Sequence, residues 1–144
     1  MPRRNIGFEL HTLNHRVHRF VDCSTHKKYI DNITGTNGWI IGYIGSNRDR
    51  DVYQRDFEKD FGITRSTASK VVNLMVTKGL IERVAVQHDA RLKKLVLTDK
   101  AEELVKFMDE DHRVVNEMLI KGFSDEELDN LYSYIERMRN NIII

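Results

Sequence analysis

The sequence predicts a mainly α-helical fold with one small two-stranded β-hairpin, arranged as a winged helix-turn-helix. Three observations predict this fold. Apolar residues recur at helical spacing along most of the chain. Two short helices joined by a glycine turn are expected within residues 53–77. Directly after them, two runs of strand-like composition, residues 81–87 and 92–98, flank the four residues HDAR.

The N-terminal part is expected to be helical. From Ile6 to about Tyr29, apolar residues follow a helical period, which predicts one long amphipathic helix. Residues 33–44, ITGTNGWIIGYI, predict a second helix with Thr34 or Thr36 as its N-cap. The polar residues after it read as a loop. The predicted buried patch of the second helix is Trp39, Ile40, Ile41 and Ile44.

The helix-turn-helix follows. A short helix over about residues 53–61 would bury Phe57 and Phe61, Gly62 would supply the turn, and Thr64 would cap the next helix. One face of that next helix is apolar, and the opposite face is polar. The apolar face is Ala68, Val71, Val72 and Met75, and the polar face is Ser66, Ser69, Lys70, Asn73 and Thr77.

The remaining elements are a hairpin and two helices. HDAR, residues 88–91, is predicted as a four-residue connection between the two strands. A helix then runs from Thr98 or Asp99 to about Lys121, and a capping box from Ser124 to Glu127 begins the last helix.

The amino-acid composition limits which classes of protein are possible. With 144 residues, 40% hydrophobic and 31% charged, one compact domain is expected. No apolar run is long enough to cross a membrane, the N-terminus is too polar for a signal peptide, and Cys23 is the single cysteine, so a cytoplasmic protein is expected. The net charge is +3 over residues 1–47, +4 over 48–98 and −6 over 99–144, so an anionic partner would meet the middle segment.

The helix and the hairpin together suggest contacts with duplex DNA. Hydroxyl and amide side chains of the second helix, Ser66, Ser69, Asn73 and Thr77, can read base edges, while Arg65 and Lys70 suit phosphates or guanine. On the hairpin, Arg91 suits the negative minor groove, and Lys93 and Lys94 suit phosphates. A carboxylate near DNA needs a partner, so Asp89 is expected to hold Arg65 or Arg91.

These motifs, in this order, resemble the MarR family of bacterial transcriptional regulators. The resemblance spans most of the chain and ends with FSDEE opening the last helix. One departure is that Asp99, Lys100 and Ala101 follow the hairpin, where the family often has a glycine. The residues that carry the resemblance are Thr64, Arg65, Ser66, Thr67 and Ser69 in ITRSTAS, Gly79, Leu80 and Arg83 in KGLIERV, Asp89 and Arg91 in HDAR, and Leu97 and Thr98.

The resemblance implies a homodimer built from the first and last helices, which reads a pseudo-palindromic operator. It also implies Thr67 among the DNA contacts and a small-molecule or redox signal that releases DNA. On this basis residues 1–144 form a single MarR-type domain: 1–47 and 99–144 hold the dimerisation helices and the second helix, and 48–98 form the DNA-binding lobe. Apolar stripes at both ends of so small a chain independently favour a dimer. A repressor is the expected function.

Other readings stay open at this stage. The alternative is a dimeric small-molecule-binding, redox-sensing or metal-sensing module with weak or vestigial DNA binding. His11, His15 and His18 share one side of the first helix, but no cysteine or carboxylate accompanies them as a further ligand, so neither a metal nor another cofactor is expected. No setting that would activate the thiol surrounds Cys23. Since no catalytic constellation stands out, an enzyme is not expected.

Overall fold

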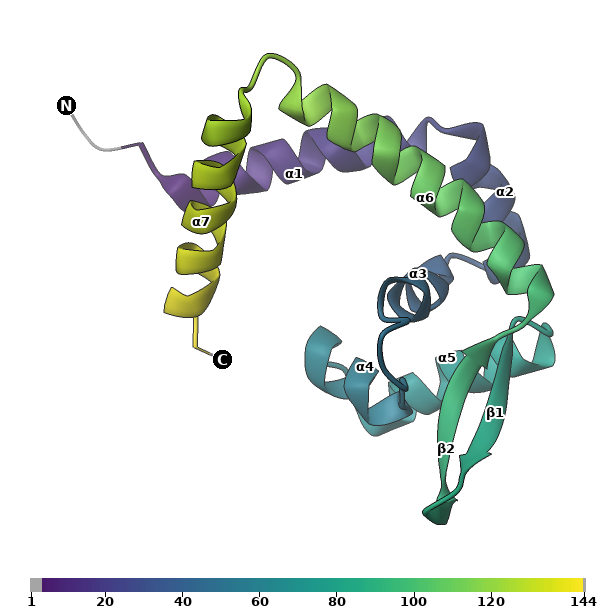
Figure 1. Cartoon of the computed structure of the whole chain (residues 1–144). Helices are drawn as coiled ribbons and strands as arrows, with labels where there is room; N and C mark the ends of the chain where they lie inside the picture. Colours follow the sequence, from purple (N-terminus) through teal and green to yellow (C-terminus); the bar gives the residue numbers. More distant parts are fainter. Residues whose placement is uncertain (1–3, 144) are drawn as a thin grey trace. The chain divides into compact units, whose positions relative to one another are not determined.

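The computed structural model describes residues 4–143 of the chain. Met1–Arg3 and Ile144, which belong to the predicted domain span, lie outside the described residues. The chain forms two compact units that divide between Asp111 and His112, within one long helix. The elements, in order, are α1 (Ile6–Asp22), α2 (Thr25–Thr34), α3 (Gly38–Ser46), α4 (Gln54–Phe61), α5 (Arg65–Thr77), β1 (Ile81–Val86), β2 (Asp89–Leu97), α6 (Asp99–Ile120) and α7 (Asp125–Asn141) (Figure 1).

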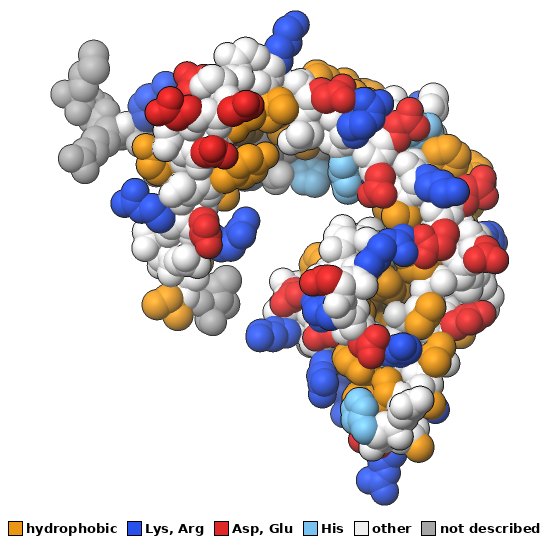
Figure 2. Space-filling model, in the orientation of Figure 1, with side chains coloured by type: hydrophobic (Ala, Val, Ile, Leu, Met, Phe, Trp, Pro, Cys, Tyr) orange, Lys and Arg blue, Asp and Glu red, His pale blue; other side chains and the backbone are white. Residues whose placement is uncertain are grey.

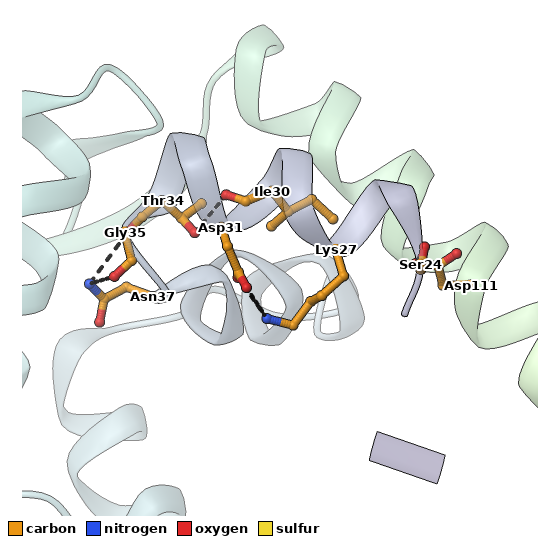
Figure 3. A network of polar contacts seen from close by, with 8 residues as sticks. All are labelled: Ser24, Lys27, Ile30, Asp31, Thr34, Gly35, Asn37 and Asp111. Carbon is orange, nitrogen blue, oxygen red and sulfur yellow. Dashed lines mark hydrogen bonds and ion pairs between the residues drawn. The ribbon is translucent and has the colours of Figure 1, made fainter. Parts of the chain in front are cut away.

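The predicted long first helix is wrong, because the structure divides it into α1 and α2. α1 ends at Asp22, and Ser24 begins α2 as its N-cap by accepting a hydrogen bond from the backbone N–H of His26 at 3.1 Å. The Ser24 hydroxyl also donates to Asp111 Oδ2 at 2.8 Å (Figure 3). A serine that caps a helix N-terminus and also binds a distant carboxylate favours the start of a new helix at Ser24 over one continuous helix.

The boundary of the predicted second helix is also wrong. α2 continues to Thr34, whose hydroxyl donates to the carbonyl of Ile30 at 2.8 Å, and Gly35 ends it in the left-handed region at φ +59°. Asn37 rather than a threonine precedes α3, and its amide donates to the carbonyl of Gly35 at 3.2 Å (Figure 3). Thr34 therefore ends one helix instead of capping the next.

The hydrophobic core of the first unit joins α2, α3, α4, α5, the hairpin and the start of α6. Of the predicted patch, Ile40, Ile41 and Ile44 are buried and Trp39 is half-buried. Phe57 is fully buried as predicted, whereas Phe61 is 47% exposed and lies against Trp39, with ring centroids 4.6 Å apart. The other buried apolar residues are Ile30, Val52, Ala68, Val72, Met75, Leu80, Ile81, Leu95, Ala101, Leu104 and Val105.

The two strands form an antiparallel hairpin that projects beside α5 (Figure 1). The predicted four-residue connection is wrong: only Gln87 and His88 form the turn, and Asp89 pairs with Val86 as the first residue of β2. The register shifts between Ala85 and Val86, so the residues after Asp89 lie in an irregular part of the strand. A bulge of this kind lets β2 begin earlier than its alternating pattern predicts.

The second unit consists of the end of α6 and α7. Ser124 and Glu127 form the predicted capping box, with the Glu127 N–H donating to Ser124 Oγ at 3.2 Å and the Ser124 N–H to Glu127 Oε2 at 2.8 Å. None of the described helices combines the length and the apolar character that crossing a membrane requires. The predicted mainly α fold with a two-stranded wing is thus confirmed, while dimerisation stays a prediction.

Candidate nucleic-acid interface

The turn between α4 and α5 is built by a glycine and a threonine. Gly62 ends α4 with φ +60°, a left-handed conformation that a residue with a side chain adopts at a cost. Thr64 then caps α5, because its hydroxyl accepts a hydrogen bond from the Thr67 N–H at 3.2 Å. Ala68, Val72 and Met75 are buried and fix one side of α5 to the core. The opposite side of α5 is therefore held outward.

The outward side of α5 carries most of the predicted contact residues. All of them are exposed except Ser69, which is half-buried. Thr67 already donates its N–H to Thr64, and its hydroxyl accepts from the Thr64 hydroxyl at 3.0 Å. The exposed members are Arg65, Ser66, Thr67, Lys70, Asn73 and Thr77. The surface of this helix thus presents neutral donors and acceptors beside two cations.

Asn73 has a partner, Arg83, that was not expected among the contact residues. The guanidinium of Arg83, on β1, donates a hydrogen bond from Nη2 to Asn73 Oδ1. Both side chains are exposed. The signal available in the sequence was the alternation of β1, which places Arg83 two residues after the buried Ile81.

The end of the hairpin carries basic side chains. Figure 2 shows Lys and Arg side chains at the free end of the wing. Arg91 and Lys93 are exposed there. Asp89 contacts Arg91, one of the two arginines expected as its partner, but through the backbone: Asp89 Oδ1 accepts from the backbone N–H of Arg91 at 2.9 Å. The carboxylate therefore shapes the strand before Arg91 and leaves the guanidinium outside that contact.

Lys94 is half-buried, unlike the exposed Arg91 and Lys93. Its ammonium lies 3.4 Å from Asp51 Oδ1, in the loop between α3 and α4, and its side chain is 33% exposed. The same loop binds β2 through the backbone, with the Leu95 N–H donating to the carbonyl of Val52 at 2.8 Å. Asp51 was not anticipated from the sequence. Phosphate contact by Lys94 stays a prediction, in competition with this carboxylate.

The α3–α4 loop has two further cations with protein partners. Arg48 forms an ion pair with Glu102 of α6, and the hydrogen bond from Arg48 lowers the pKa of the Glu102 carboxyl. Arg50 lies 3.2 Å from Asp56 and donates to the Tyr43 hydroxyl at 2.8 Å. Burial, and then the hydrogen bond to Asp60, raise the pKa of Tyr43. These pairs brace the loop against α3, α4 and α6.

The N-terminal histidines and Cys23 are not gathered into a site in the part of the chain that the structure describes. Residues 4–143 contain no group of three or more His, Cys, Asp or Glu side chains placed to hold a metal ion. Cys23 is exposed at the C-terminus of α1. The one place where the structure collects the predicted contact residues is the surface formed by α5 and the hairpin.

The helix-turn-helix and the hairpin together define the class of protein, which is a winged-helix protein with its polar helix face and basic wing on the surface. Residues 31–92 match the model of the MarR family. This part of the chain is therefore similar to the MarR family, the family that the motifs predicted. Members of this family are transcription regulators and not enzymes.

Solved structures of MarR-type regulators resemble the chain over most of its length. The MarR transcription regulator from Oenococcus oeni PSU-1 is 29% identical, over 94% of this chain and 99% of that chain, with a TM-score of 0.61. A putative MarR family transcriptional regulator from Listeria monocytogenes, solved with a 26mer DNA, is 17% identical over 96% and 89% of the two chains, with a TM-score of 0.76. MepR from S. aureus, solved as a DNA complex, is 21% identical over 96% and 98%, with a TM-score of 0.73.

Proposed function

We propose that the chain is a sequence-specific double-stranded DNA-binding regulator that represses transcription as a homodimer on a pseudo-palindromic operator. The observation that carries this proposal is the exposed polar face of α5 beside a wing that ends in exposed Arg91 and Lys93. A helix of this width fits the major groove, and a guanidinium beside it suits the narrow minor groove. The DNA complexes of the Listeria and S. aureus proteins support the same use of this fold.

The contact residues divide into two proposed roles. Ser66, Ser69, Asn73 and Thr77 offer short polar groups that can read base edges. Arg65, Lys70 and Lys93 carry charges that suit phosphates, and Thr67, near the helix N-terminus, can donate to a phosphate there. Mutation of a base reader should change sequence preference, while mutation of a phosphate contact should change affinity on all sequences.

The homodimer is supported by apolar side chains that each unit leaves exposed. In the first unit, Phe8, Leu10 and Leu13 of α1 are 64%, 47% and 48% exposed. In the second unit, Leu131 and Ile135 of α7 are 38% and 37% exposed, beside other apolar residues of the same helix. Contiguous apolar surface of this kind is typical of an interface. A two-fold dimer would place two recognition helices about 34 Å apart, one turn of DNA.

We further propose that the protein works in the cytoplasm and that a small-molecule effector releases it from DNA. Both proposals rest on the similarity to the MarR family and not on a ligand-binding site identified in the structure. Operator titrations with candidate ligands would test release directly.

The test of the proposed function begins with selection of bound fragments from random duplex DNA by the full-length protein. On the selected site, Arg91→Ala is expected to weaken binding about tenfold or more, because one guanidinium leaves the minor groove. Lys93→Ala should lower affinity and reduce the slope of log affinity against log salt by about 1. Fluorescence anisotropy at several salt concentrations measures both quantities.

Arg19→Ala is the matched control, because Arg19 is an exposed arginine on α1, outside the proposed interface with DNA. It removes the same charge and should leave affinity nearly unchanged. Equal affinities for wild type and Arg91→Ala would refute the role of the wing, and the absence of any enriched site would refute the proposed function itself.

A further inference from the structure

The contact between Arg83 and Asn73 fixes which way the Asn73 amide points. A guanidinium carries hydrogen-bond donors and no acceptor, so the amide atom that faces Arg83 must be the oxygen. The structure has this arrangement, with Arg83 Nη2 donating to Asn73 Oδ1. The amino group of Asn73 therefore points away from Arg83. The hydrogen bond with Arg83 therefore determines which atom of the Asn73 amide is the oxygen and which is the nitrogen.

The backbone positions of both residues are held by the core. Arg83 pairs with the buried Leu95 across the hairpin and lies two residues from Ile81, which is 1% exposed. Asn73 directly follows Val72, which is 0% exposed. The Leu80 N–H donates to the carbonyl of Met75 at 2.9 Å, which joins the end of α5 to the start of β1. The two side chains thus meet between rigid elements.

Asn73 also lies on the surface of α5 that is proposed to face bases. Ser66, Asn73 and Thr77 are spaced i, i+7 and i+11, so they form one stripe along the helix. Ser66 and Thr77 are exposed, as Asn73 is. An amide turned away from Arg83 can therefore direct its amino group at a base edge beside this stripe.

This orientation changes what Asn73 can read. An unrestrained asparagine pairs with adenine through two hydrogen bonds, accepting from the N6 amino group and donating to N7. Arg83 occupies one lone pair of the oxygen and places a cation beside it, which disfavours the approach of a base amino group to that oxygen. The amide then offers mainly donors, which match O6 and N7 of guanine or O4 of thymine, whereas adenine presents its N6 amino donor beside N7. We propose that Arg83 is a positioning residue that makes Asn73 a donor and so directs base preference at one operator position away from adenine. The proposal rests on the proposed function.

The experiment compares DNA selections by full-length wild type, Asn73→Ala, Arg83→Met, Arg83→Lys and the double variant Asn73→Ala/Arg83→Met. The position that loses its preference in Asn73→Ala is the one that Asn73 reads. At that position, Arg83→Met should shift the ratio of guanine plus thymine to adenine at least about fivefold toward adenine. Arg83→Lys should keep the wild-type ratio, because an ammonium is also a donor without an acceptor.

The double variant should match Asn73→Ala at that position, since Arg83 acts there through Asn73. Lys93→Ala is the charge control and should change affinity without changing base frequencies. Thermal melting of each variant reports folding. All three substituted residues, Asn73, Arg83 and Lys93, are exposed, so the variants should melt close to wild type.

Several results would overturn the proposal while leaving the proposed function intact. These are unchanged base ratios in Arg83→Met, equal shifts in Arg83→Met and Arg83→Lys, a further shift in the double variant relative to Asn73→Ala, or an Asn73→Ala selection identical to wild type. A wild-type selection without any enriched site would instead overturn the proposed function, and this inference with it.

Discussion

Arg48 and Glu102 connect the loop after α3 to the first turn of α6. The pair is partly exposed, with side-chain exposures of 53% and 37%, so its contribution is that of a surface pair, about 0.5 kcal/mol. The pKa of Glu102 is lowered in the folded protein, first by the hydrogen bond from Arg48. A carboxyl with a lowered pKa stabilises the fold above its unfolded pKa, and this stabilisation is lost as the pH falls through the folded pKa.

Glu102→Gln should therefore destabilise the protein at neutral pH by about 0.5 kcal/mol. The difference from wild type should shrink as the pH falls below the ordinary value of 4.5 for glutamate, because protonated glutamate resembles glutamine. Urea unfolding at pH 7, 5 and 3 measures this difference. Glu103→Gln, one residue along the same helix and exposed, is the control. A constant difference across this pH range would contradict the assigned ion pair.

At the scale of elements, Gly62 determines where α4 ends and how α5 leaves it. Its φ is +60°, and a Cβ at this position would meet nothing within 4 Å. The cost of a side chain is therefore conformational and not steric. Gly62→Ala should lower the free energy of unfolding by about 1 kcal/mol, as urea denaturation would show.

Gly62→Asn is the matched comparison, because asparagine adopts the left-handed region more readily than alanine does. Asn should restore much of the lost stability. If Ala and Asn destabilised the protein equally, the conformational explanation of the turn would be wrong. Since α5 carries the proposed DNA contacts, the alanine variant should also bind DNA less tightly at temperatures near its midpoint.

Local signals in the sequence were sufficient for most of the elements. Thr64, Gly62 and the Ser124–Glu127 capping box act within four residues of their partners, so their roles could be read from spacing. The helix break at Ser24 could not be predicted from spacing, because the Ser24 hydroxyl also binds Asp111, 87 residues away. The contacts of Arg83 with Asn73 and of Lys94 with Asp51 could not be predicted from spacing either, since they depend on how the hairpin packs against α5 and the α3–α4 loop.

At the scale of the whole molecule, the exposed apolar residues of α7 follow a spacing that suits helix packing. Leu128, Leu131, Ile135 and Met138 recur at i, i+3, i+7 and i+10, which forms one continuous stripe. Leu131 and Ile135 are more than a third exposed, and Leu128 and Met138 are half-buried. Exposed apolar surface of this kind is typical of a protein interface, and we propose that a second copy of the chain buries the stripe.

Ile135→Glu should then shift the protein from dimer to monomer, because the dimer would bury an unpaired carboxylate at its interface. Light scattering after size exclusion, over a range of protein concentrations, measures the mass of the particle.

Val84→Glu is the control: Val84 lies on the wing and is 37% exposed, the same as Ile135, so the same charge is introduced away from the proposed interface. Because a monomer can occupy only one half-site, Ile135→Glu should also lose most of its affinity for a full operator while Val84→Glu stays dimeric. A wild type that is monomeric at every concentration, or an Ile135→Glu variant that keeps the dimer mass, would rule out α7 as the dimerisation helix.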